Sequence, residues 1–332
     1  MSDNPAREVL DLSGADASLT AIETAQEAGV DLEIARRIWR ALGFPDVDDN
    51  VKAFGTDDVS ALHVTKQILD SGWPVEEILS ISRVYGQSIS RIADAETRGF
   101  TTVFLQPQTG DGATIEDLAV RLAPGIFRML DLSATLLDYL HRKHLSVAIE
   151  GVVSSSGGAT EVMSAGFVDI VGFSQLSEEL HGGDLGDDLS LFDDIAISAC
   201  AEAGARLVKL VGDAAMFVSS DPAAAIEAAL EILEQVEECD KLPVARAGVD
   251  HGEVVPKDGD YFGRPVNVAA RMTAFARPGS LVTSRAALDA AGDTRLAVSR
   301  VGTRKLKGVG PVELFRVRRA ATEAETSGDL AR

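Results

Sequence analysis

The hydrophobic pattern of the chain changes near residue 160, and this change limits the fold more than any other feature. Residues 18–140 carry apolar side chains at helical spacing. From about residue 165, short β-rich runs alternate with helical runs. A single layered core does not accommodate both patterns, so we expect two domains of different class, which also suits a length of 332 residues.

The first domain is predicted to be all-helical. Gly29 suits the end of one helix and Asp31 the start of the next, while Pro74 fits the first turn of a later helix. We assign this domain to residues 1–140. A linker is expected at 141–163, because it contains a run of small, flexible residues, Ser-Ser-Ser-Gly-Gly-Ala.

The second domain is predicted to be an α/β sandwich with mostly antiparallel strands, because a tight hairpin is expected at Gly212-Asp213. The predicted strands are 165–173, 205–211, 214–219, 244–250, 280–283, 296–301 and 312–318, and the predicted helices are 188–203, 221–239, 264–276 and 284–291. We assign the domain to 164–319 and expect a disordered tail at 320–332. The chain as a whole is therefore expected to be α+β.

Charge is distributed unevenly along the chain. With 31 basic and 52 acidic residues, the net charge is −21, which disfavours nucleic acid and anionic membranes as partners. Residues 241–319, however, sum to +8, so this stretch is suited to an anion. No apolar run is long enough to span a membrane, no signal peptide is evident, and two cysteines fit a reducing, cytoplasmic location.

Two carboxylates stand out in apolar surroundings. Asp169 lies within Phe-Val-Asp-Ile-Val-Gly-Phe-Ser, and Asp213 ends Lys-Leu-Val-Gly-Asp at the predicted hairpin. A carboxylate in an apolar strand is costly unless it is paired or binds a cation. Both residues therefore have two interpretations, a turn or cap residue, or a ligand that holds Mg²⁺ together with substrate phosphates.

A third motif, Asp-Tyr-Phe-Gly-Arg-Pro-Val-Asn-Val-Ala-Ala-Arg-Met, begins at Asp260. Asn267 and Arg271 are four residues apart and share one face of the predicted helix. Such a pair in isolation is ordinarily a solvated face. Arg246 lies upstream of this helix and Lys307 downstream, both in the positively charged stretch.

In this order and spacing, the motifs resemble the catalytic domain of class III nucleotidyl cyclases over residues 164–318. The helical first half and the ending Glu-Leu-Phe-Arg-Val-Arg-Arg are similar to actinobacterial soluble adenylate cyclases with a helical autoregulatory domain. The resemblance implies a ferredoxin-like sandwich. It also implies conversion of ATP to 3′,5′-cyclic AMP and pyrophosphate by in-line attack of the 3′-oxygen, regulated by the helical domain.

The resemblance also implies roles for individual residues. Asp169, Asp213 and the main-chain carbonyl of Ile170 would hold two Mg²⁺ or Mn²⁺ ions. Arg246 and Lys307 would contact phosphates. Arg271 would stabilise charge at the α-phosphate, and Asn267 would orient the ribose.

Lys209 and Asp260 match the positions that contact the base. Adenine offers an acceptor at N1 and a donor at N6, which a lysine and an aspartate complement, whereas guanine has the opposite requirement. The sequence therefore favours ATP over GTP.

In this family, active sites form between two catalytic domains arranged head to tail. The chain carries both sets of residues, so the resemblance implies a homodimer with two equivalent, shared sites. One alternative is a catalytically silent cyclase-like nucleotide sensor. Another is a DNA-binding regulator, because residues 20–44 look like a helix-turn-helix in which Arg36, Arg37 and Arg40 face phosphates.

The regulatory signal is a separate question. His141 and His144 flank Arg142 and Lys143 at the predicted junction, which makes a pH-dependent change of charge one hypothesis. Two solvated histidines are the alternative. The apolar faces of 113–140 suit either contact between two chains or a lipid-like ligand, and the sequence does not decide between them.

Overall fold

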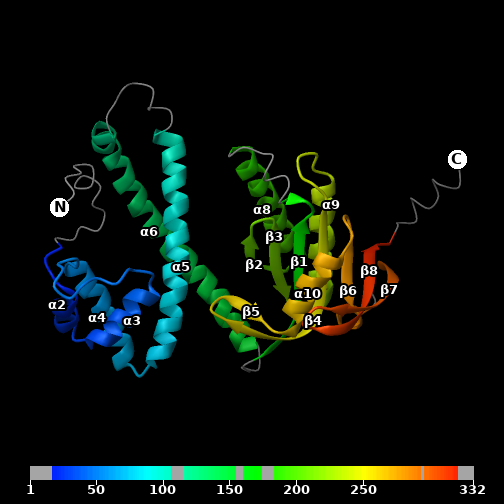
Figure 1. The fold of residues 1–332 in the computed structure, drawn as a ribbon, viewed down its shortest axis with the longest axis horizontal. Helices are drawn as coiled ribbons and strands as arrows, with labels where there is room; N and C mark the ends of the chain where they lie inside the picture. Colours follow the sequence, from blue (N-terminus) through cyan, green and yellow to red (C-terminus); the bar gives the residue numbers. More distant parts are fainter. Residues whose placement is uncertain (1–16, 106–114, 155–159, 174–182, 293–294, 321–332) are drawn as a thin grey trace, which may run out of the picture. The chain divides into compact units, whose positions relative to one another are not determined.

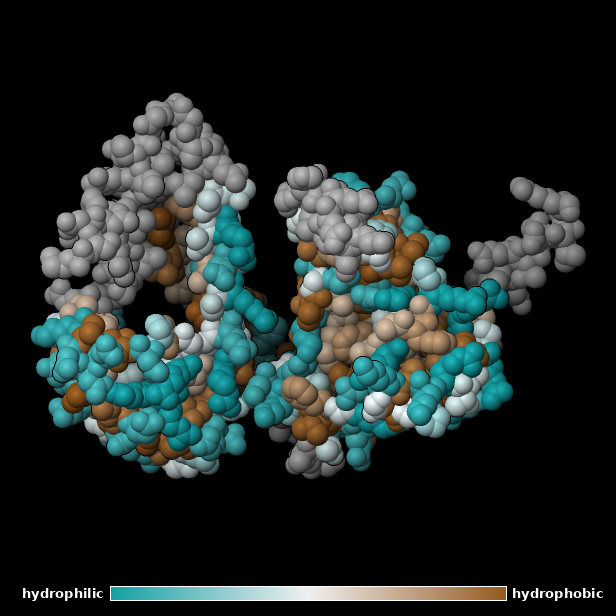
Figure 2. Space-filling model, in the orientation of Figure 1, coloured by the Kyte–Doolittle hydropathy of each residue, from teal (hydrophilic) through white to brown (hydrophobic). Residues whose placement is uncertain are grey.

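A computed structural model describes residues 17–105, 115–154, 160–173, 183–292 and 295–320 (Figure 1). The chain divides into two compact units, Met1–Gly157 and Gly158–Arg332, and each is considered by itself. Hydrophilic residues cover much of the visible surface of both units, interrupted by apolar patches (Figure 2). Among the described residues, no helix combines the length and the apolar character needed to cross a membrane.

The first unit is built from helices, as predicted. They are α2 (Ala21–Ala28), α3 (Leu32–Ala41), α4 (Thr56–Asp70), α5 (Val75–Phe100), a π-helical turn η1 (Thr101–Leu105) and α6 (Ile115–Ser154). The predicted caps are present: Gly29 ends α2 in a left-handed conformation, and the Asp31 carboxylate accepts main-chain N–H groups at the start of α3. Buried residues from the first four helices form the core, among them Ala35, Ile38 and Leu62.

Helices α5 and α6 run antiparallel, since Tyr85 lies beside His141 and Glu96 accepts a hydrogen bond from Ser133 at 2.5 Å. Helix α6 continues to Ser154, through most of the region expected to be a linker. No proline interrupts residues 141–154, and the Arg142–Asp138 pair supports the helix at one-turn spacing. Residues 155–159 and 321–332, which include all but the first residue of the flexible run and nearly all of the predicted tail, lie outside the described residues.

The second unit is an α/β sandwich, as predicted. Its strands are β1 (Glu161–Ile170), β2 (Arg206–Val211), β3 (Ala214–Ser219), β4 (Ala245–Lys257), β5 (Asp260–Phe262), β6 (Leu281–Ser284), β7 (Leu296–Leu306) and β8 (Gly310–Arg319), and its helices are α8 (Gly183–Ala203), α9 (Pro222–Glu237), α10 (Arg264–Phe275) and α11 (Arg285–Ala291). The strand order is β2-β3-β1-β4-β6-β8-β7, with β5 paired to β4. Only the β4–β6 pairing is parallel among the described strands.

The two faces of this sheet have different covers. Val168 and Ile170 of β1 pack with α8 and α9 in the larger core, as do Ala247 and Val249 of β4. Because side chains alternate along a strand, Asp169 and Gly248 lie on the opposite face, where α10 packs. A Cβ on Gly248 would lie 2.6 Å from the main-chain oxygen of Ala269, so glycine permits the close approach of α10.

Strand β5 was not predicted, because three residues are too few for a hydrophobic pattern to emerge. It returns along β4 through a turn at Asp258-Gly259, where both residues have positive φ, 54° and 80°. This turn chemistry suits a two-residue hairpin. The hairpin brings Asp260 back alongside Lys257.

Candidate active site

Asp169 lies one residue before the end of β1, directly opposite Arg246 of β4. The Nε and Nη2 atoms of Arg246 donate to the same oxygen, Oδ2, at 3.0 and 2.7 Å. Arg246 Nη1 donates to the main-chain oxygen of Ala274 in α10 at 3.1 Å. About three quarters of each charged side chain is covered, since 27% of Arg246 and 25% of Asp169 is exposed. The carboxylate in the apolar strand is therefore paired.

Asp213 occupies the turn between β2 and β3 and lies near Asp169. Gly212 precedes it with φ 61°, a left-handed conformation that favours glycine. The main-chain oxygen of Asp213 accepts the N–H of Ile170 at 3.0 Å, which joins the turn to the end of β1. Burial raises the pKa of the Asp213 carboxyl, the charge of Asp169 raises it further, and Arg246 opposes this rise. The two carboxylates thus influence each other electrostatically.

These residues fit a divalent cation that also binds substrate. Asp169 and Asp213 offer hard carboxylate oxygens, and burial, together with the charge of Asp169, raises the pKa of the Asp213 carboxyl. A cation between the two carboxylates would offset both effects. In the described part of the chain, no group of three or more acidic, histidine or cysteine side chains gathers as a complete metal cage. Mg²⁺ commonly binds one or two carboxylates and takes its other ligands from phosphates and water.

Lys209 and Asp260 form an ion pair between β2 and β5. A β-bulge in β2 sets the position of Lys209. Leu207 is opposite Phe217 of β3, so a regular register would place Lys209 opposite Ala215, but Lys209 is instead opposite Met216. The bulge moves Lys209 to the face that carries Met216, Phe167 and Asp169. Without it, Lys209 would share the face of Leu207, which packs against the larger core.

Asn267 and Arg271 lie on α10, one turn apart, as predicted. Asn267 is exposed and its Nδ2 donates to the main-chain oxygen of Gly263 at 3.1 Å. Arg271 approaches the β7–β8 turn that contains Lys307, since a Cβ on Gly308 would lie 3.6 Å from Arg271 Nη2. Within the described residues, neither Arg271 nor Lys307 has an anionic partner. They form a region suited to an anion.

The nine predicted site residues thus fall into three groups. The first joins the ends of β1, β3 and β4; the second joins β2 to β5; the third lies on α10 and the β7–β8 turn. Their members are Asp169, Ile170, Asp213 and Arg246; Lys209 and Asp260; and Asn267, Arg271 and Lys307. Among the described contacts, no hydrogen bond or ion pair links one group to another.

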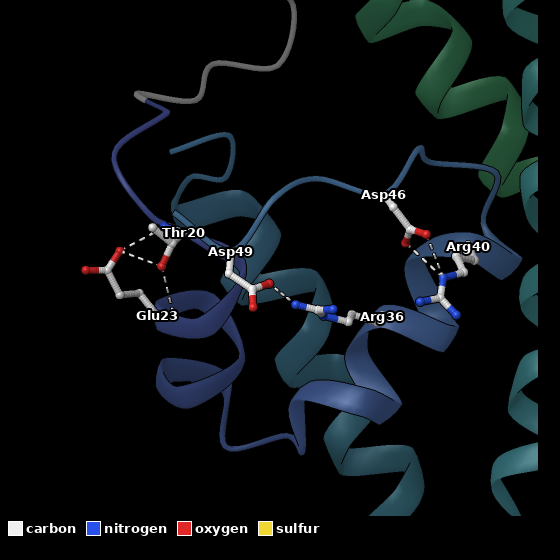
Figure 3. A network of polar contacts seen from close by, with 6 residues as sticks. All are labelled: Thr20, Glu23, Arg36, Arg40, Asp46 and Asp49. Carbon is white, nitrogen blue, oxygen red and sulfur yellow. Dashed lines mark hydrogen bonds and ion pairs between the residues drawn. The ribbon is translucent and has the colours of Figure 1, made fainter. Parts of the chain in front are cut away.

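The proposed phosphate-facing arginines of the helical unit are already paired. Arg36 pairs with Asp49, Arg40 Nε donates to Asp46 at 2.8 and 3.1 Å, and Arg37 pairs with Glu76 at 2.5 Å. Figure 3 shows two of these pairs between α3 and the chain that follows it. Phosphates would compete with these carboxylates for the three arginines, which disfavours the DNA-binding alternative.

Asp250 is a further carboxylate of this face that the sequence analysis did not single out. It is fully buried in β4, and Ser284 donates to its Oδ1. Its Oδ2 has no hydrogen-bond partner among the described atoms, and the nearest cation, Arg264 at the start of α10, is 3.8 Å away. Burial raises the pKa of the Asp250 carboxyl. The signal that drew attention to Asp169, an acidic residue in an apolar strand, applies here too.

Family profiles match both units of the chain. Residues 6–140 match the adenylate cyclase regulatory domain. Residues 158–319 match the adenylate and guanylate cyclase catalytic domain.

Relatives of known name match most of the chain. A pH-sensitive adenylate cyclase of Mycobacterium tuberculosis is 32% identical over 325 residues, covering 93% of this chain and 80% of the relative. An adenylate cyclase of Streptomyces coelicolor is 30% identical over 79% of this chain and 69% of its own length. The crystal structure of an adenylyl cyclase from P. aeruginosa aligns with a TM-score of 0.45 at 22% identity, covering 49% of this chain and 97% of that one.

The buried carboxyl of Asp250 leads to a prediction about stability and pH. Because its folded-state pKa is raised, the folded state binds the proton more tightly, so stability falls as pH rises through that pKa. Asp250→Asn removes the ionisable group. Its unfolding midpoint should exceed that of the wild type by a few degrees near pH 8, since about 1 kcal/mol shifts the midpoint of such a domain by roughly 2–4 °C.

The difference should shrink as the pH is lowered toward the carboxyl's ordinary range. Thermal unfolding of the full chain, followed by far-ultraviolet circular dichroism across this pH range, measures it. A difference in midpoint that does not change with pH would contradict the prediction.

Proposed function

The chain belongs to the adenylate and guanylate cyclase family, and from this we propose that it converts ATP to 3′,5′-cyclic AMP and pyrophosphate. The observation that carries the choice of ATP is the Lys209–Asp260 pair. These side chains present a hydrogen-bond donor and an acceptor next to each other on one face of the sheet. Adenine needs such a pair, whereas guanine would leave both groups mismatched.

The cost of a mismatch sets the expected selectivity. An unpaired buried polar group costs roughly 1–3 kcal/mol, which corresponds to about tenfold to a few hundredfold in discrimination. Guanylate-type members of the family carry an acidic residue at the lysine position. Lys209 therefore favours ATP as the substrate and cyclic AMP as the product.

Asp169, Asp213 and the carbonyl of Ile170 would hold two divalent cations, Mg²⁺ or Mn²⁺. Bound there, such ions make the ribose 3′-hydroxyl more acidic and offset the charge of the triphosphate. Both contacts of Arg246 with Asp169 are to Oδ2, which leaves Oδ1 for a cation. Arg246 would contact a phosphate bound beside this carboxylate.

The α10 group would act on the ribose and the phosphates. Asn267, exposed near the start of α10, would orient the ribose so that its 3′-oxygen is in line with the α-phosphorus. Arg271 and Lys307 have no anionic partner in the described structure, which leaves both free to stabilise charge that develops on the phosphates. The protein would act mainly through positioning and electrostatics.

We further propose that two chains share each active site. The support is that this chain carries both sets of residues that the family divides between two catalytic domains. A head-to-tail homodimer would bring them together, with Asp169, Asp213 and Arg246 from one chain and Lys209, Asp260, Asn267, Arg271 and Lys307 from its partner. Exposed apolar residues on α6, such as Leu132, Leu136 and Tyr139, offer additional surface for association.

A catalytically silent nucleotide sensor is the main alternative. It would be favoured if a metal-binding aspartate, Asn267 or Arg271 were missing, and all four positions are filled. Two free cysteines support a cytoplasmic location, as proposed from the sequence.

The helical unit is proposed to regulate the catalytic unit, supported by its match to a regulatory domain and by the pH-sensitive relative. Within this unit, the ring of His141 lies 6.4 Å from the ring of Tyr85 on α5. Along α6, Asp138 precedes His141 by three residues and Arg142 follows it directly. Protonation of His141 would add positive charge where α5 and α6 meet. We therefore keep His141 and His144 as the proposed sites of pH sensing.

Turnover and base choice are tested together. The full chain should form cyclic AMP from ATP in the presence of Mg²⁺ or Mn²⁺, measured by chromatography of the products. The variant Lys209→Glu/Asp260→Ser should lose roughly tenfold or more in kcat/KM for ATP, because adenine then meets the wrong donor and acceptor. Absence of cyclic AMP from the wild type would favour the silent sensor, and unchanged ATP kinetics in the variant would refute the base assignment.

The pH proposal is tested on the full chain. In His141→Ala/His144→Ala, the ratio of activities at about pH 6 and pH 8 should move toward one, because both proposed sensing histidines are gone. His63→Ala, which removes an exposed histidine of α4, serves as the matched control and should retain the wild-type profile. An unaltered profile in the double variant would rule out these histidines as the sensor.

A further inference from the structure

Asp260 is fixed by contacts on both of its carboxylate oxygens. Lys209 of β2 pairs with Oδ2, and the main-chain N–H of the next residue, Tyr261, donates to Oδ1 at 2.8 Å. The direction of the carboxylate therefore depends on where Tyr261 lies. Tyr261 in turn belongs to β5, a strand of only three residues whose one partner among the described strands is β4.

The side chain of Tyr261 anchors this short strand on the sheet. Only 7% of Tyr261 is exposed, and its ring packs with buried residues of β1, β3 and β4, namely Ala165, Met216, Val218 and Val254. At the other end of the ring, Arg206 Nη1 donates to the phenolic oxygen at 3.3 Å. The guanidinium carbon of Arg206 lies 5.8 Å from the ring centroid, within range of a cation–π interaction.

Arg206 begins β2, the strand that also carries Lys209. Two contacts therefore join β2 to β5, Arg206 with Tyr261 and Lys209 with Asp260. The second must rearrange when a base binds, because Lys209 and Asp260 then direct their polar atoms to the base. The contact between Arg206 and Tyr261 involves neither base-reading group, so it can persist while a nucleotide is bound.

We propose that Arg206 and Tyr261 form a clamp that sets the position of Asp260 relative to Lys209 and thereby determines how well the site discriminates adenine from guanine. This inference rests on the proposed role of Lys209 and Asp260 in base recognition. Arg206 and Tyr261 act as positioning residues: they hold the strand that presents Asp260 and do not contact the base themselves.

The clamp has a specific kinetic consequence. Loosening β5 should leave Arg246, at the opposite end of β4, and Lys307, in the β7–β8 turn, in place. The loss should therefore appear in KM for ATP more than in kcat, and it should weaken ATP relative to GTP. A general loss of structure would instead weaken both nucleotides to the same extent.

The test compares KM for ATP with the inhibition constant of GTP as a competitor in the full-length protein. Tyr261→Phe removes the hydroxyl but retains the packed ring, and Arg206→Gln removes the cation at an exposed strand end. Each should raise KM for ATP about two- to tenfold with kcat little changed, as loss of one hydrogen bond predicts. The preference for ATP over GTP should fall by a similar factor.

The double variant, Arg206→Gln/Tyr261→Phe, should be no more impaired than Arg206→Gln alone, because loss of the guanidinium already removes both the hydrogen bond to the hydroxyl and the contact with the ring. Arg300→Gln is the matched control. It removes another arginine whose partner, Glu313, is 2.7 Å away on the surface of β7 and β8, and it should leave the preference unchanged.

Lys209→Glu/Asp260→Ser provides the reference for base recognition. If this reference variant keeps the wild-type preference, the base assignment fails and the clamp fails with it. If the reference variant loses the preference for ATP over GTP, but Tyr261→Phe and Arg206→Gln fold and keep this preference, only the clamp proposal is overturned. The clamp proposal is also overturned if both clamp variants weaken the binding of ATP and of GTP by the same factor. If Tyr261→Phe does not fold, the result for Arg206→Gln decides.

Discussion

The catalytic unit depends on how one carboxylate is accommodated at the end of an apolar strand. Val168 and Ile170, on either side of Asp169, are essentially inaccessible to solvent. Asp169 lies on the other face of the sheet, but three quarters of its side chain is also covered, and an isolated charge there would be strongly unfavourable. Arg246 supplies the compensating charge from the directly opposite position on β4, and the same guanidinium binds the carbonyl of Ala274 in α10. One arginine thus connects β1, β4 and α10.

Strand alternation then gathers the other polar groups on the same face. Helices α8 and α9 cover one side of the sheet with a continuous apolar core, which leaves the α10 side for charged residues. Asp169 and Arg246 reach this face through ordinary alternation, whereas Lys209 reaches it only through the β-bulge after Leu207. Gly248 lets α10 lie close to the sheet while Asn267 and Arg271 remain accessible. The α10 side of the sheet is therefore polar because of the strand register and because of the bulge in β2.

The sequence was sufficient to predict the two classes of domain and nearly all the helices and strands, because long segments show clear periodicity. It did not predict β5, which is three residues long, or the continuation of α6 through 141–154, where charged and small residues suggested a linker. The bulge that orients Lys209 has no clear sequence signal. Asp250 was detectable by the reasoning applied to Asp169, but the pairing of Arg36, Arg37 and Arg40 depends on contacts that only the folded chain brings together.

The central proposal is that residues from two chains complete each active site, because the chain carries both sets of residues that the family divides between two catalytic domains. Mixing inactive Asp169→Ala with inactive Asn267→Ala tests it most directly. Half of randomly formed dimers are mixed and each has one intact site, so cyclic AMP formation should recover to about a quarter of the wild-type rate. No recovery, with mixed dimers demonstrated in the same sample, would contradict the shared site.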